Sequence, residues 1–213
     1  MEFLLENILN LIGFLVGLGI GIMSLIGFRN TGSPTLFRLS IAFFSISIGF
    51  FVIWAGYMAE DFVVKSGHIE RWVQTLGIAI QTVGYFFIAF SHSIKAFFPK
   101  SSYFRSVGIL PFFLVSSVQL EHIFRSISFI LLAYGAIETM LSYLDNRNKG
   151  AISVSIGLAL LALGEFLGWY SFVFPESILY SVSMVIKIGG LIALFIPVSK
   201  VPLTKIKFDE GLE

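Results

Sequence analysis

The sequence contains no cysteine, which excludes disulfide bonds, thiolate metal sites and catalysis by a thiol. Charged residues are also scarce, because Asp, Glu, Lys and Arg make up only 13% of the 213 residues. The sequence has no H-E-x-x-H, G-x-S-x-G or phosphate-binding glycine loop, so hydrolytic chemistry has no support. We therefore expect a protein that is not an enzyme and that holds no metal and no cofactor. We expect no nucleic-acid partner either, since no motif for one is present.

Apolar residues, by contrast, dominate the chain. They account for 56% of it, and the mean hydropathy is +0.90, which is typical of a multi-pass protein in a lipid bilayer. A spanning helix needs about 20 apolar residues. On this rule the sequence predicts an all-α integral protein of the cell membrane, with seven transmembrane helices forming one domain over 1–213. These helices are expected at 7–27, 36–58, 72–94, 103–120, 124–144, 151–173 and 177–198.

The basic residues predict how this bundle is oriented. Ten Lys and Arg residues fall in the loops and the tail of one side, against three on the other: Lys65, Arg71 and Arg125. Because basic loops stay in the cytoplasm, we expect the N-terminus outside and 201–213 as a cytoplasmic tail. A very tight turn within 119–125 is expected to separate the fourth helix from the fifth. An acidic and histidine-containing group on the outer side is expected to consist of solvated loop residues: Glu60, Asp61, His68, Glu70, Glu121 and His122.

The second half of the chain repeats features of the first. Ser40, Gly49, Phe51 and Trp54 recur 115 positions later as Ser155, Gly164, Phe166 and Trp169. Gln81, Gly84 and Ser93 recur 106 positions later as Lys187, Gly190 and Ser199. Gly17, Ser24 and an R-N-x-G segment recur 118 positions later. We therefore predict a 3+1+3 parallel internal repeat, related by an axis along the membrane normal. Its first three-helix unit covers 7–98, its linker helix 103–120 and its second unit 124–200.

Three charged residues fall inside predicted spans: Glu138, Glu165 and Lys187. Charges deep in a bilayer are costly unless they are paired or hydrated, so they mark candidate functional sites. At 1.5 Å per residue, Lys187 lies about 17 Å and Glu165 about 21 Å from the cytoplasmic ends of their helices. These depths predict a direct or water-bridged pair. A pair that only fixes helix register is the structural alternative.

Polar residues on neighbouring helices extend this candidate site. Gln74, Gln81, Tyr85 and His92 share one side of the third helix, and Gln81 is the repeat counterpart of Lys187. Polar groups on such a side line a cavity or form interhelical hydrogen bonds. The predicted ligand or proton site comprises Glu165, Lys187, Glu138, Gln81, Tyr85, Ser183 and Trp169.

Two family resemblances give functional expectations. The 3+1+3 layout resembles that of sugar-porter and PQ-loop transporters, although the chain has no Pro-Gln dipeptide. This resemblance implies a transporter or receptor for a small solute or proton. A lysine at the middle of the seventh helix resembles that of a microbial rhodopsin. It implies a retinal Schiff base on Lys187, with Ser183 on the same face and Glu165 or Glu138 as counter-ion.

A third hypothesis is that the protein is a non-catalytic subunit or a sensor within a membrane complex. It would then bind a protein partner or form a homo-oligomer.

Overall fold

The computed structural model describes residues 2–63, 68–93, 117–146, 149–171, 174 and 178–199. Within them the chain forms six α-helices and no strand. The helices are α1 (Glu2–Thr31), α2 (Pro34–Val63), α3 (His68–Ser93), α4 (Ser117–Asn146), α5 (Lys149–Tyr170) and α6 (Leu179–Ser199). All six are long and apolar enough to cross a membrane. The predicted all-helical, multi-pass character is therefore supported.

The link between α1 and α2 shows how the sequence sets helix ends. Gly32 has a left-handed φ of 68°, and its N–H donates to the carbonyl of Phe28 at 2.7 Å. Glycine adopts this conformation without steric cost and so terminates α1. Pro34 then begins α2, at the helix position where its missing N–H is not needed.

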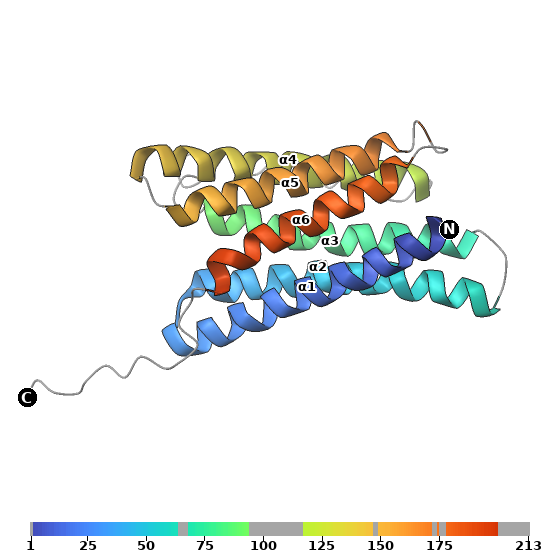
Figure 1. Cartoon of the computed structure of the whole chain (residues 1–213), viewed down its shortest axis with the longest axis horizontal. Helices are drawn as coiled ribbons and strands as arrows, with labels where there is room; N and C mark the ends of the chain where they lie inside the picture. Colours follow the sequence, from blue (N-terminus) through green and yellow to red (C-terminus); the bar gives the residue numbers. More distant parts are fainter. Residues whose placement is uncertain are drawn as a thin grey trace, which may run out of the picture.

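The six helices lie side by side along one direction (Figure 1), and their contacts form a closed ring in chain order. Within the part of the chain that is described, the backbones of consecutive helices approach closely, and α1 packs against α6 to close the ring. Helices α1, α3, α4 and α6 begin at one end of the bundle, and α2 and α5 run in the opposite direction (Figure 1). We name these two ends the Glu2 end and the Thr31 end.

Two pairs of adjacent helices in the ring run in the same direction, α1 with α6 and, consecutive along the chain, α3 with α4 (Figure 1). Ser93 and Ser117 therefore lie at opposite ends of the bundle. The predicted linker helix lies outside the described residues except for its last four, which belong to the first turn of α4. The tight turn predicted within 119–125 is wrong, because α4 is continuous from Ser117 to Asn146. The predicted tail 201–213 lies outside the described residues.

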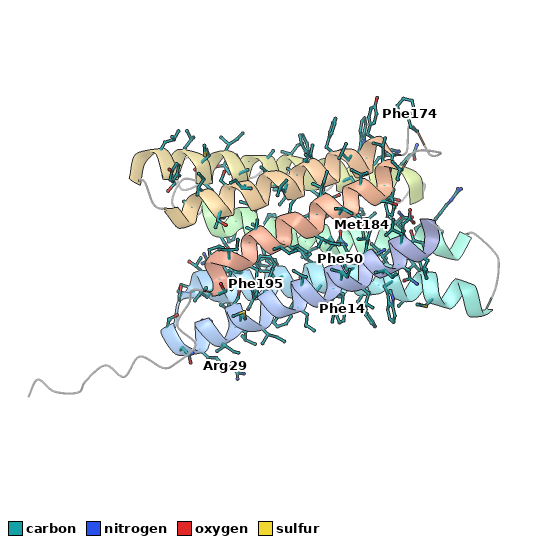
Figure 2. All side chains as sticks on the ribbon, viewed as in Figure 1. Phe14, Arg29, Phe50, Phe174, Met184 and Phe195 are labelled. Atoms are coloured by element: carbon teal, nitrogen blue, oxygen red, sulfur yellow. The ribbon has the colours of Figure 1, made fainter. Side chains whose placement is uncertain are left out.

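The interior of the ring is mostly apolar. The side chains that fill it are almost completely buried and include Ile20, Phe43, Ile46, Phe50, Leu158, Leu161 and Leu191. Figure 2 shows Phe50 and Met184 among the helices, whereas Arg29 points away from them. Apolar side chains also cover much of the outer surface, for example Ile48, Ile137 and Ile192. An apolar exterior around helices whose backbone groups are paired internally suits a bilayer.

Glycines bring the helices of two pairs into close contact. A Cβ placed on Gly49 of α2 would lie 2.5 Å from Cγ of Gln81 in α3, and one on Gly164 of α5 would lie 2.5 Å from Cγ of Lys187 in α6. Small residues permit such approach in membrane bundles, where the hydrophobic effect does not drive helix association. The two contacts occupy positions that the sequence repeat relates to each other.

We predict that Gly49→Ala and Gly164→Ala each destabilise the bundle by about 1–3 kcal/mol, because overpacking forces neighbouring atoms to move. Thermal unfolding of the detergent-solubilised protein measures this effect. Gly189→Ala is the matched control, since nothing lies within 4 Å of its added Cβ. Equal melting temperatures for all three variants would show that the close contacts at Gly49 and Gly164 are not present.

Candidate functional site

Four charged side chains form a continuous series of ion pairs inside the ring, which we name the charge chain: Glu121, Arg125, Glu165 and Lys187. Oε1 of Glu121 lies 2.8 Å from Nη2 of Arg125 and accepts a second bond from Nε at 3.0 Å. Nη1 of Arg125 lies 3.3 Å from Oε2 of Glu165. Oε1 of Glu165 lies 2.6 Å from Nζ of Lys187. Negative and positive side chains alternate along the charge chain, so its four formal charges cancel.

Glu165 is the central member of the charge chain. Each of its two oxygens faces a different cation, one from α4 and one from α6. None of the four side chains is more than 4% exposed. Buried charges require partners, and removing one member of a buried pair costs about 3–5 kcal/mol. Glu165 therefore connects three helices through interactions that the apolar interior makes strong.

Local sequence explains why these groups meet. Glu121 and Arg125 are four residues apart and so share a face of α4. Gly164 makes room for the stem of Lys187, and Gly168 makes room for the guanidinium of Arg125, which a Cβ would strike. Glu165 thus lies on α5 between two glycines, each of which admits one of its two cations.

Two polar side chains of α3 lie on the inner side of the ring near Glu165. The Tyr85 hydroxyl interacts electrostatically with Glu165 and Arg125. Gln81 lies one helical turn away on the same face of α3. Both are at least 99% buried. Among the described residues, neither of the two polar atoms of the Gln81 amide has a hydrogen-bond partner.

Aromatic side chains surround the part of the charge chain nearest the Glu2 end. The ring centroid of Tyr180 lies 5.8 Å from Cζ of Arg125, within the range of a cation–π interaction. Tyr180 in turn interacts with Tyr57 of α2. His122 and Trp169 meet edge to face, with ring centroids 6.0 Å apart. Helices α2, α4, α5 and α6 thus all contribute aromatic or imidazole groups to this region.

The predicted site residues are only partly brought together. Glu165 and Lys187 make the contact that their depths predicted, while their functional role stays a proposal. Ser183 is one turn from Lys187, but its hydroxyl donates to the carbonyl of Gly164 at 2.8 Å. Glu138 accepts a hydrogen bond from Tyr134 at 2.8 Å, and it lies about 20 Å along α4 from Arg125. The structure does not place Glu138 with the charge chain.

Two members of the charge chain, Glu121 and Arg125, are not among the site residues predicted from the sequence. The prediction that Glu121 is a solvated loop residue is wrong, because it is only 3% exposed, and Arg125, which was counted only among the basic residues of the outer side, is 1% exposed. The error followed from the predicted turn within 119–125. The available signal was a Glu and an Arg at i and i+4 beside a long apolar run, a spacing that forms an ion pair on a helix. The structure does not describe the side chains of five other polar residues of the sequence: Glu60, Asp61, His68, Glu70 and His92. Among the residues that it describes, no group of acids and histidines is suited to hold a metal ion.

We predict that Arg125→Met destabilises the protein by about 3–5 kcal/mol, because it leaves Glu121 without its main partner and Glu165 with only one cation. The double variant Arg125→Met with Glu121→Leu removes one acid and one base, so it should recover most of this loss. Unfolding in detergent measures both, with Arg71→Met, which alters an exposed residue, as control. A double variant no more stable than the single one would contradict the pairing.

Comparison with protein families, curated proteins and solved structures finds no match for this chain. The function must therefore be argued from the geometry of the charge chain and its surroundings.

Proposed function

We propose that the chain is a seven-helix protein of the cell membrane that binds and translocates a proton or a small polar solute at the charge chain. The observation that carries this proposal is the position of Glu165. It is fully buried in the ring, it is shared by two cations, and it interacts with the buried hydroxyl of Tyr85. Ionisable residues inside a membrane most often line pathways for ions, protons or solutes. We propose a role in binding and transport rather than in catalysis.

Two observations support the proposed layout of seven helices in two related halves. Helices α3 and α4 run in the same direction (Figure 1), so the connecting residues 94–116, which hold most of the predicted fourth span, join opposite ends of the bundle. The glycine contacts at Gly49 and Gly164 involve equivalent atoms of Gln81 and Lys187, at positions that the repeat relates. The excess of Lys and Arg in the loops of the opposite side supports an orientation in which the Glu2 end faces the outside of the cell.

The extent of the charge chain favours transport over a purely structural role. A device that only fixes helix register would be complete with the pair formed by Glu165 and Lys187. Here Arg125 and Glu121 extend that pair toward the Glu2 end, because Glu121 lies on the second turn of α4. Phe50 and Leu161, both fully buried, belong to the apolar core of the ring. We interpret the charge chain as an access route from one side, which the apolar core closes off from the other.

Glu165 can couple ligand binding to movement of the helices. As a carboxylate it attracts Arg125 of α4 and Lys187 of α6. A proton that binds to Glu165 removes this negative charge and weakens both attractions at once. Helix α5 is then less strongly held to its two neighbours, and the two cations are free to pair with other acceptors. Binding at one residue thereby changes two helix interfaces, which is what alternating exposure of a site requires.

We predict that the purified protein in liposomes conducts protons along an imposed pH gradient and that Glu165→Gln lowers this flux at least tenfold, since the amide cannot bind and release a proton. A fluorescent pH indicator inside the liposomes measures the flux. Glu138→Gln is the matched control, because Glu138 lies on α4 away from the charge chain and bonds Tyr134. Equal fluxes for the unchanged protein and Glu165→Gln would refute the proton route.

The retinal-binding alternative has one supporting observation. Glu165 lies 2.6 Å from Nζ of Lys187, where it would serve as the counter-ion of a protonated Schiff base. The ring interior, however, already contains the buried side chains of Phe50, Tyr85 and Leu191. Addition of all-trans retinal followed by borohydride reduction distinguishes the photoreceptor from the transporter. A stable mass increment that Lys187→Met abolishes would favour the photoreceptor.

A further inference from the structure

Helices α1 and α3 carry three buried amides with hydrogen-bonding atoms that lack partners within the described residues. Gln81 is 1% exposed, and both its amide oxygen and its amide nitrogen are unpartnered within the described residues. The amide oxygens of Asn7 and Asn10 on α1 are likewise buried without a partner. Buried polar groups in native proteins almost always have a partner, so each exception requires an explanation. These amides offer several acceptors, and the Gln81 nitrogen is a donor without an acceptor. The Tyr85 hydroxyl, which interacts with Glu165, lies one helical turn from Gln81.

The repeat explains why these amides lie opposite charged residues. Gln81 is the counterpart of Lys187, 106 positions earlier, and Asn7 is the counterpart of Arg125, 118 positions earlier. Phe50 stands in the first half where Glu165 stands in the second. The first half therefore contributes amides at the positions of the two cations Lys187 and Arg125, and an apolar ring at the position of Glu165.

Charge balance restricts the ligand that this arrangement takes. The two acids and two bases of the charge chain already cancel, so a charged solute would add an uncompensated charge to an apolar interior, which is costly. A neutral solute adds none. The amide oxygens require N–H or O–H donors from it, and the Gln81 nitrogen requires an acceptor.

We propose that the site takes a small neutral solute that carries both hydrogen-bond donors and an acceptor, of the amide or urea class. Gln81 and Tyr85 bind this solute against Glu165, which accepts a further hydrogen bond from it. The inference rests on the proposed transport function and specifies its substrate class. Gln81 and Tyr85 determine the specificity, and the charge chain supplies the coupling between binding and helix movement.

Tracer exchange in liposomes tests this inference. Liposomes that contain the full-length protein are preloaded with unlabelled urea, and the uptake of radiolabelled urea is followed. We expect saturable uptake above that of protein-free liposomes. Acetamide should compete, whereas acetate, which is charged, and tetramethylurea, which has no donor, should not. Gln81→Leu and Tyr85→Phe should each lower the uptake at least tenfold.

The variants are chosen so that loss of folding is recognised. Tyr85→Phe removes a single oxygen, and Gln119→Leu, which alters an exposed glutamine on α4, is the control expected to retain uptake. Each variant is also assayed for the proton flux that depends on Glu165. Uptake that survives in Gln81→Leu and Tyr85→Phe would overturn the inference. So would the absence of urea uptake by a protein that still conducts protons, and that result would leave the proposed function standing. Absence of both activities would overturn both proposals.

Discussion

The carboxylate of Glu165 is the group on which the rest of this structure depends. It is completely buried, and its two oxygens face Arg125 of α4 at 3.3 Å and Lys187 of α6 at 2.6 Å. In an apolar interior such contacts are far stronger than in water, and leaving any one of the charges alone is correspondingly costly. Arg125 is held in turn by Glu121 through two bonds. The four groups therefore have to be present together.

This electrostatic requirement also constrains the packing of the helices. The guanidinium of Arg125 reaches Glu165 only because Gly168 has no side chain, and the stem of Lys187 passes Gly164 for the same reason. Closure of the ring through contact between α1 and α6 encloses the charge chain within helices on all sides. The fold and the site are thus specified by overlapping sets of residues, and a change in the glycines is expected to alter both.

The sequence predicts a good part of this arrangement. Length and hydropathy locate the six described helices, because a bilayer imposes a minimum apolar length on every span. Depth along the helices correctly predicts that Glu165 meets Lys187, since residue rise is constant. Glu121 and Arg125 were missed because hydropathy treats a charged residue as a sign of a loop, whereas an ion pair one turn apart can remain in a helix. Glu138 was predicted as a site residue because it is a charged residue within an apolar span, but it lies about 20 Å along α4 from Arg125 and bonds Tyr134 instead. Contact between α1 and α6 depends on packing of the whole ring, which no local pattern encodes.

The measurement that tests this account most directly is a double-mutant cycle on the two residues in closest contact, Glu165 and Lys187. The free energy of unfolding in detergent is compared for Glu165→Leu, Lys187→Met and the double variant. Glu165→Leu leaves the buried Lys187 without an acidic partner, and Lys187→Met leaves Glu165 with Arg125 as its one cation. Breaking this buried pair should cost about 3–5 kcal/mol in the first variant, and the second should also be destabilised. The double variant should cost far less than their sum, because Arg125 keeps its two bonds to Glu121. Additive losses, with no coupling between the two positions, would contradict the claim that Glu165 holds the bundle together through its buried ion pairs.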